Sequence, residues 1–235
     1  RGSPILHHSL DMFLEQLPEA AAQAKTSKPA MVVLVMDPKY QPDYQCFVDK
    51  YKGTLAFANP GVERQGSVES GLNKLIELSP QCELVAVHDS ARPLVTTTEI
   101  YDVVRDARQH GAAVLGVPCK ATIKECKTIT STTDDAEEEV MVERTIPRSR
   151  LWEVHTPQVI QIPTLLKGFK KVQEESLEVT DDVSIVEAMG EPVKLTRGEY
   201  TNLKITTPED MDVADAILDE RQKAGAPGLK VSEGI

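Results

Sequence analysis

Short apolar runs alternate with amphipathic stretches along most of the chain, and this pattern predicts strands and helices in turn. The runs are compact, whereas the stretches between them repeat apolar residues every three or four positions, as one buried helix face requires. The predicted strands are 31–36, 54–58, 84–87, 112–117, 158–162, 192–196 and 202–205, and the predicted helices are 5–17, 42–52, 64–78, 97–110, 164–174, a short one ending at 189, and one beginning at 208. This order is typical of an α/β fold with a mostly parallel, doubly wound sheet.

Three local features refine the prediction. The run from Met31 to Met36 is apolar throughout, which favours a strand covered on both faces. Pro18 should end the first helix, because the proline ring does not fit a helix interior. Gly111 should cap the helix over 97–110 at its carboxyl end.

The alternation changes between about 121 and 146. Two segments of alternating apolar and polar residues, 121–128 and 140–146, flank the polar run 131–139, which predicts a protruding hairpin arm with a solvated acidic tip. A metal site at that tip is the less favoured alternative; its carboxylates would be Asp134, Asp135, Glu137, Glu138 and Glu139. We expect one domain over 1–222 that includes this arm, and a flexible tail over 223–235.

Composition narrows the classes of partner. The 235 residues carry a formal net charge of -11 and a sequence pI near 5.0, which argues against general binding to nucleic acid or to anionic membranes. No apolar stretch approaches the ~20 residues that span a bilayer, so a soluble protein is expected. The residues from Arg1 onward do not resemble a signal or transit peptide. The cysteines form no close pair and are interpreted as reduced, mostly buried thiols; they are Cys46, Cys82, Cys119 and Cys126.

Candidate chemistry first appears after the apolar run 84–87, where His88-Asp89-Ser90-Ala91-Arg92-Pro93 follows. Ligands bind at the carboxyl ends of parallel strands in open α/β sheets. Asp89 could hold a divalent metal such as Mg²⁺, and Arg92 could fork onto a phosphate, so the pair suggests phosphate chemistry on a nucleotide. The structural alternative is that Asp89 caps a turn or helix and Arg92 is its ion-pair partner.

The loop 59–68 precedes a predicted helix, one crossover before Asp89, and should face the same crevice. Gly61 and Gly66 would permit close approach of the backbone to a ligand, and Ser67 offers a hydroxyl. Hydroxyls and cations at the ends of other segments could receive a phosphorylated substrate; they are Thr122, Lys124, Arg148, Thr156, Thr180 and Lys204. Each of them alone is equally typical of a surface or capping residue.

Five motifs in order carry a family resemblance over nearly the whole chain. They resemble 2-C-methyl-D-erythritol 4-phosphate cytidylyltransferases, especially the plant-type forms, and are LVAVHDSARP (84–93), VPCKATIKE (117–125), LWEVHTPQ (151–158), VTDDVSIVE (179–187) and YTNLKITTPED (200–210). The resemblance implies a Rossmann-like nucleotidyltransferase domain whose arm completes a homodimer. It also implies attack by the substrate phosphate on the α-phosphorus of CTP, assisted by Mg²⁺. The products would be 4-diphosphocytidyl-2-C-methyl-D-erythritol and pyrophosphate, in non-mevalonate isoprenoid synthesis.

The resemblance assigns roles by position. Gly61, Val62 and Ser67 would contact cytidine, and Asp89 would bind Mg²⁺ beside the nucleotide. Arg92 and Lys204 would hold phosphate-bearing substrate or the developing charge, which makes them catalytic together with Asp89. The methylerythritol phosphate pocket would take Thr122, Arg148 and Thr156 from the partner subunit and Thr180 from the same subunit. Plant-type similarity points to the plastid stroma, with the cytoplasm as the alternative for a bacterial protein.

One part of the family pattern has no counterpart in the printed sequence. The family begins with a strand and a Gly-rich loop, with an Arg and a downstream Lys, that cradles the CTP triphosphate; Gly2-Ser3-Pro4-Ile5 resembles the part after that Lys. Without the strand, its central neighbours would lack main-chain partners, at a cost above the ~5 to 15 kcal/mol by which domains are stable. We therefore expect these 235 residues to be inactive and poorly folded. Two alternatives are a non-catalytic paralogue that pairs through its arm with an intact copy, and a cytidylyltransferase for another alditol phosphate.

Overall fold

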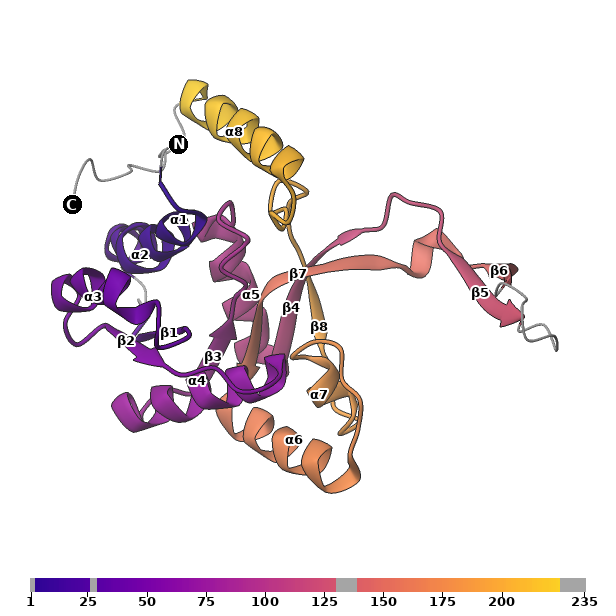
Figure 1. Ribbon diagram of the computed structural model, residues 1–235, viewed down its shortest axis with the longest axis horizontal. Coiled ribbons are helices and arrows are strands. Elements are labelled where there is room, and N and C mark those ends of the chain that lie inside the picture. The colour runs from indigo at the N-terminus through magenta and orange to yellow at the C-terminus, as the bar shows by residue number, and fades with distance from the viewer. Residues whose placement is uncertain (1–2, 26–28, 130–138, 225–235) are drawn as a thin grey trace.

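The computed structural model describes residues 3–25, 29–129 and 139–224. Helices lie on both sides of a sheet core, and one hairpin projects far from it (Figure 1). The core strands are β1 (Val32–Val35), β2 (Leu55–Ala58), β3 (Leu84–Val87), β4 (Ala112–Pro118), β7 (Trp152–Gln161) and β8 (Lys194–Arg197). The helices are α1 (Ile5–Asp11), a π-helical turn η1 (Met12–Gln16), α2 (Leu17–Ala24), α3 (Gln41–Lys50), α4 (Arg64–Leu78), α5 (Thr97–His110), a 3-10 turn η2 (Arg148–Arg150), α6 (Ile162–Glu175), α7 (Ser184–Glu187) and α8 (Pro208–Lys223).

The core strands form two separate sheets. One contains β1 and β2 in parallel, and the other has the order β3-β7-β4-β8. In the larger sheet β7 runs against β3 and β4, whereas β8 is parallel to β4, so β7 is the reversed strand of a mostly parallel arrangement. The predicted α/β class is therefore confirmed.

Two apolar layers cover the larger sheet, one on each face. Side chains alternate between the faces of a strand, so Val114 packs on one side and Leu115 on the other. The first layer joins that face to α4, α6 and α7, and the second joins the opposite face to η1, α2 and α5. A capping box begins α5, in which the Thr96 hydroxyl and the Glu99 carboxylate bond each other's main-chain amides, and Gly111 (φ 90°) ends it as expected.

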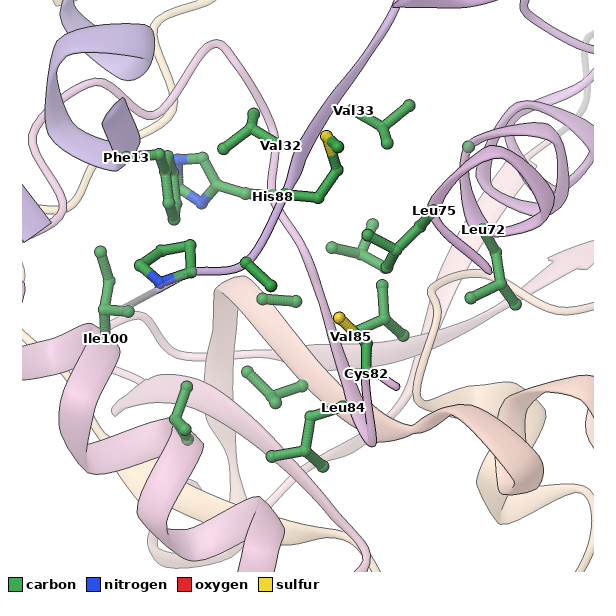
Figure 2. A pocket seen from close by; sticks show the side chains of 18 of the residues that line it. Phe13, Val32, Val33, Leu72, Leu75, Cys82, Leu84, Val85, His88 and Ile100 are labelled. Carbon is green, nitrogen blue, oxygen red and sulfur yellow. The ribbon is translucent and has the colours of Figure 1, made fainter. Parts of the chain in front are cut away.

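A cavity of about 1170 Å³ separates the two sheets, between β1 and β3 (Figure 2). This explains one wrong expectation: the strand within 31–36 is half-buried at every position, not covered on both faces. Among the described residues β1 pairs with β2 alone, so its other edge borders the cavity.

Other expectations about elements were also wrong. The first helix continues through Pro18 to Ala24, because η1 widens the helix there and places Pro18 in the first turn of α2, where no amide is required. Segment 202–205 is not a strand. Its residue Asn202 is instead fully buried and donates a side-chain hydrogen bond to the carbonyl of Thr156 (2.9 Å), which ties two loops together.

The arm is an antiparallel hairpin of β5 (Lys124–Ile129) and β6 (Glu139–Thr145), which confirms the predicted hairpin (Figure 1). The acidic positions 134–138 and residues 225–235 of the expected tail lie outside the described residues. Cys119 is buried, but Cys46 on α3 and Cys126 on the arm are exposed, because neither element is covered by a second layer. Of the described helices, none combines the length and apolarity needed to cross a bilayer.

Candidate functional site

The candidate site is built around Asp89, two residues beyond the end of β3. Its side chain is 21% exposed, and each of its oxygens faces a cation. Oδ2 lies 2.9 Å from Nζ of Lys204, and Oδ1 lies 3.6 Å from Nη2 of Arg64. Burial alone would raise the pKa of Asp89, but Lys204, Arg64 and Arg92 together lower it below its ordinary value. Asp89 is therefore an ionised carboxylate at neutral pH, in a local surplus of positive charge.

A chain of hydrogen bonds fixes the backbone that carries Asp89. The Asp89 amide donates to the Thr156 hydroxyl (3.0 Å), which lies 3.1 Å from Nδ1 of His88. The other ring nitrogen of His88, Nε2, lies 3.1 Å from the main-chain oxygen of Arg92. Burial lowers the pKa of His88 to about 4, so the ring is neutral, with Nε2–H donating to Arg92 and Nδ1 accepting from Thr156. His88, the first residue of the loop 88–92, thus fixes this loop through the two hydrogen bonds of its ring.

This network predicts a loss of stability in mild acid. His88 has a pKa of about 4 when folded and about 6.5 when unfolded, so the unfolded chain binds more protons between these values. Stability should be complete above pH 6.5 and fall towards pH 4, by up to about 3 kcal/mol from this residue. Urea unfolding at pH 5 and pH 7 measures the difference.

The control for this prediction is His88→Asn, whose amide oxygen can accept the Thr156 hydrogen bond but does not titrate. We expect the variant to be less stable at pH 7 and to lose less stability on acidification than the wild type. Equal pH dependence in the two proteins would contradict the assignment to His88. His155, also with a pKa of about 4 owing first to burial, remains in both proteins and cancels in the comparison.

Arg92 is held against the main chain. Nη1 donates to the carbonyl of Asn202 (2.6 Å), and Nη2 lies 3.5 Å from the carbonyl of Val154. Its buried Nε has no hydrogen-bond partner within the described structure, and no described carboxylate lies within 4.0 Å of its guanidinium. The structural alternative, an Asp89–Arg92 ion pair, is therefore not what the structure contains, because Lys204 and Arg64 occupy the carboxylate instead. A guanidinium without a carboxylate partner can receive a phosphate.

Sequence reasoning missed the ion pair between Arg64 and Asp182. The guanidinium contacts both carboxylate oxygens of Asp182 at 2.8 Å, although 118 residues separate the two in sequence. The Asp182 side chain is only 1% exposed, and its amide donates to Oε1 of Gln158 (2.9 Å). Burial raises the pKa of Asp182, and Arg64 opposes that rise. The available signal was weak: Arg64 begins a predicted helix after a glycine loop, and Asp182 directly precedes the short predicted helix that ends at 189.

The glycine loop leads directly into Arg64 and therefore lies at the same site. The amide of Gly61 donates to the Ser67 hydroxyl (3.0 Å), and that hydroxyl donates to the carbonyl of Glu63 (3.1 Å). A Cβ atom on Gly61 would lie 2.5 Å from the carbonyl carbon of Gly66, closer than real Cβ contacts allow. Val62 at the tip of the loop is fully exposed. Gly61 is thus required for a tight turn that presents backbone and Val62 to solvent at the start of α4.

The family resemblance implies that this turn contacts CTP, and on that basis we expect Gly61→Ala to weaken CTP binding by at least ~10-fold, because the added methyl group must displace backbone in the loop. Gly66→Ala is the matched control, since a Cβ there would meet Gly61 at an ordinary 3.4 Å. Calorimetric titration with CTP gives both dissociation constants. Equal affinities for the two variants would contradict a binding role for this turn.

The structure brings some of the predicted residues together and leaves others apart. Asp89, Arg92, Thr156 and Lys204 are linked by the contacts above, and Arg64 connects them to the glycine loop. Thr180 is exposed and lies close in sequence to Asp182. The other two are exposed, and none of the contacts above links them to this cluster; they are Thr122, which precedes β5, and Arg148 of η2, whose guanidinium donates to the carbonyl of Lys120 (2.9 Å).

The donor set around Asp89 fits a metal that brings its own oxygen ligands. No group of three or more His, Cys, Asp or Glu side chains suitable for a metal occurs among the described residues. An all-protein cage is therefore not formed in that part of the chain. Mg²⁺ is commonly held by one or two carboxylates together with substrate phosphates, and Asp89 suffices for such a site.

Comparison with known proteins shows which family of sequences this chain resembles. The sequence profile described as "IspD: 2-C-methyl-D-erythritol 4-phosphate cytidylyltransferase" matches residues 1–220. A chloroplastic 2-C-methyl-D-erythritol 4-phosphate cytidylyltransferase of Oryza sativa subsp. japonica is 44% identical over 220 residues, which are 94% of this chain and 66% of the rice protein. A relative of the same name in Desulforamulus reducens is 39% identical over 221 residues, 93% of this chain and 85% of that protein.

Solved structures show the same similarity. The 4-diphosphocytidyl-2C-methyl-D-erythritol synthase of Anaerococcus prevotii superposes with a TM-score of 0.76 at 27% identity, over 93% of this chain and 90% of that one. The 2-C-methyl-D-erythritol 4-phosphate cytidylyltransferase of Thermus thermophilus gives a TM-score of 0.65 at 30% identity, again over 93% and 90% of the two chains. The fold and the sequence motifs thus agree.

Proposed function

Because the chain belongs to the 2-C-methyl-D-erythritol 4-phosphate cytidylyltransferase family, we propose that its site transfers the cytidylyl group of CTP to 2-C-methyl-D-erythritol 4-phosphate. The products are 4-diphosphocytidyl-2-C-methyl-D-erythritol and pyrophosphate, in non-mevalonate isoprenoid synthesis. The observation that carries the proposal is the arrangement of Arg64, Arg92 and Lys204 around the single carboxylate of Asp89. Three cations against the two carboxylates Asp89 and Asp182 leave a net positive charge at the end of β3, which suits phosphorylated substrates.

The chemistry requires positioning and charge neutralisation more than a strong base. The nucleophile is a phosphate oxygen that is already ionised, and negative charge develops on the pyrophosphate that leaves. Arg92, whose Nε has no partner among the described residues, and Lys204, a half-exposed ammonium beside Asp89, are placed to bind phosphate oxygens. Such fixed positive charge, aimed at the developing charge, is the main source of rate enhancement in reactions of this class.

The metal in this proposal is Mg²⁺ on Asp89. When bound, the ion would neutralise part of the negative charge of the triphosphate. Asp89 is ionised and lies at the centre of the site, and its backbone is fixed through Thr156 and His88, so it offers a positioned hard ligand. Gly61, Val62 and Ser67 contact the cytidine in the same proposal, because the turn places them beside Arg64.

A homodimer formed through the arm is the proposed assembly. Apolar side chains on the hairpin face solvent, and Val140, Met141 and Val142 are 67%, 47% and 57% exposed. Side chains alternate along a strand, so Val140 and Val142 lie on one face of β6 and Met141 on the other; exposed apolar side chains on a projecting hairpin favour a protein interface. The arm would deliver Thr122 and Arg148 to the methylerythritol phosphate pocket of the partner, opposite Thr180. Thr156, expected from the sequence to come from the partner subunit, is bonded instead to Asp89 and His88 of its own subunit and belongs to that subunit's site. The chloroplastic rice relative supports the plastid stroma as the proposed compartment.

Pyrophosphate release with CTP, Mg²⁺ and 2-C-methyl-D-erythritol 4-phosphate tests the proposed reaction. The assay compares the 235-residue chain with a version extended at Arg1 by a strand and Gly-rich loop of the family type. We expect turnover in the extended protein and little or none in the shorter chain. Pentitol phosphates serve as competing acceptors and should react more slowly. Failure of both proteins, or preference for another alditol phosphate, would contradict the proposal.

A further inference from the structure

The arm leaves the sheet core through two segments, 118–123 and 146–153, which we call the arm root. A main-chain hydrogen bond joins the two segments, in which the Cys119 amide donates to the carbonyl of Leu151 (3.0 Å). Beyond the root, the hairpin projects away from the sheet core (Figure 1). Contacts at the arm root therefore set the direction of the arm.

Arg148 lies in the arm root, and its position depends on Lys120. Its Nη1 donates to the carbonyl of Lys120 (2.9 Å), and no described carboxylate lies within 4.0 Å of the guanidinium. The Lys120 amide donates in turn to Oε1 of Glu153 (3.3 Å). The guanidinium of Arg148 is thus placed by the main chain at position 120.

The side chain of Lys120 lies over an aromatic ring. Its Nζ is 3.4 Å from the centroid of the Tyr200 ring, and the Tyr200 hydroxyl donates to the carbonyl of Pro118 (2.7 Å). An ammonium group in this position is attracted by the negative face of the ring. Tyr200 therefore contacts the arm root at two points, two residues apart in the chain.

Lys120 differs from the other described lysines that lie over a tyrosine ring. Lys39 and Lys50 lie over the rings of the tyrosines next to them, but each also forms an ion pair with a carboxylate. No described carboxylate lies within 4.0 Å of Nζ of Lys120, so the Tyr200 ring is the group that holds its ammonium. Loss of the ring would free this side chain, because its four-carbon stem is flexible.

Tyr200 comes from a segment that also holds two cations of the candidate site. The carbonyl of Asn202 accepts a hydrogen bond from Arg92 (2.6 Å), and Lys204 pairs with Asp89 (2.9 Å). The hydroxyl and ring of Tyr200 bond to none of these groups. Replacing Tyr200 should therefore disturb the arm root and leave the contacts around Asp89 in place.

We propose that Tyr200 is a positioning residue for the acceptor phosphate. It fixes Lys120 in the arm root and, through the carbonyl of Lys120, the guanidinium of Arg148. This inference rests on the proposed function, which places Arg148 in the methylerythritol phosphate pocket of the partner subunit. A guanidinium that is already held in one orientation loses less conformational freedom when it binds a phosphate. Tyr200 acts through Lys120 and Arg148 and needs no contact with the substrate.

Steady-state kinetics of the extended protein test this role. We expect Tyr200→Leu to raise KM for 2-C-methyl-D-erythritol 4-phosphate by about 10-fold, because Arg148 loses its fixed position. The fall in kcat should be smaller, and KM for CTP should stay within about 2-fold of the wild type. Tyr200→Phe keeps the ring under Lys120 and should keep KM for the acceptor within about 3-fold. Tyr40→Leu, at the exposed pair with Lys39, is the matched control and should change neither KM.

A double variant tests the route through Lys120. Lys120→Ala removes the ammonium but keeps the carbonyl that Arg148 contacts. Tyr200→Leu should add little to its effect on KM for the acceptor, because both substitutions remove the same contact. Fully additive effects would overturn the proposal, since Tyr200 would then act by another route.

Nuclear magnetic resonance gives a readout that is independent of turnover. The ring current of Tyr200 should move the ε-methylene signal of Lys120 upfield in the wild type and in Tyr200→Phe, but not in Tyr200→Leu. The order parameter of the Arg148 Nε–H group should fall in Tyr200→Leu.

The two readouts separate failure of this inference from failure of the proposed function. If the wild type transfers no cytidylyl group, the proposed function fails, and the order of Arg148 alone decides whether Tyr200 positions it. An unshifted Lys120 signal in the wild type would overturn the positioning role. So would unchanged Arg148 order, or an unchanged KM for the acceptor in an active Tyr200→Leu variant.

Discussion

Replacing Asp89 with Asn is expected to lower pyrophosphate release by about 1,000-fold in the extended protein, equivalent to about 4 kcal/mol of transition-state stabilisation. The substitution keeps the size of the side chain and the main-chain amide that donates to Thr156, so the loop is preserved. It removes the negative charge that balances Lys204 and Arg64 and that would hold Mg²⁺ in the proposed reaction. The loss should therefore appear in kcat and in the Mg²⁺ dependence, with little change in Tm.

Asp102→Asn is the matched control. Asp102 lies on α5, pairs with Arg105 at the surface and has no contact with the site. Its replacement should leave turnover within a factor of about 2 of the wild type, because exposed ion pairs contribute little. Equal effects of the two substitutions, or normal Mg²⁺ dependence in Asp89→Asn, would show that Asp89 is not the metal ligand.

Replacing Arg64 with Met is expected to destabilise the fold by about 2 to 3 kcal/mol. The bidentate pair with Asp182 would be broken, and a carboxylate that is 1% exposed would lose its cation. Breaking one side of a buried pair costs more than the pair contributes, because the remaining charge is left uncompensated. Urea unfolding at pH 7 gives the difference in free energy, and the double variant Arg64→Met with Asp182→Asn should recover much of it.

The pH dependence of the stability of Arg64→Met tests whether the uncompensated charge of Asp182 causes the loss. Burial already raises the pKa of Asp182 above its unfolded value, and loss of Arg64 must raise it further. A carboxyl with a raised folded pKa takes up a proton as pH falls, which stabilises the folded state. The deficit of Arg64→Met should therefore shrink between pH 7 and pH 5. A deficit that stays constant with pH would contradict this account. Arg105→Met, at a surface ion pair, should change stability little at either pH.

The local sequence pattern was enough to predict several helices and strands and some of the site residues. The helices 64–78 and 97–110 were predicted with their observed bounds, because helical periodicity and caps act within one or two turns. Asp89 and Arg92 were identified because they directly follow an apolar strand in an α/β pattern. The glycine loop was identified by the same reasoning, since its position between a strand and a helix is fixed by chain order.

Contacts between segments far apart in the sequence could not be predicted from the local sequence pattern. Asp182 directly precedes a short predicted helix, yet its main side-chain interaction is with Arg64, 118 residues away. Segment 202–205 was predicted as a strand from its apolar residues, yet Asn202 is buried between loops and bonds Thr156 and Arg92. These roles depend on which segments contact each other in the folded protein, and the local pattern of a single sequence does not predict those contacts.

By itself the sequence determined the α/β class, the arm, the family and the residues at the end of β3, because these depend on local periodicity, turn residues and short motifs. Tertiary structure alone decided which cations surround Asp89 and that Arg64 is held by a buried Asp182. It also decided that the carbonyl of the buried Asn202 accepts a hydrogen bond from Arg92. These features arise from packing between elements far apart in the chain, where small differences in burial and charge select one arrangement among many that the same local pattern allows.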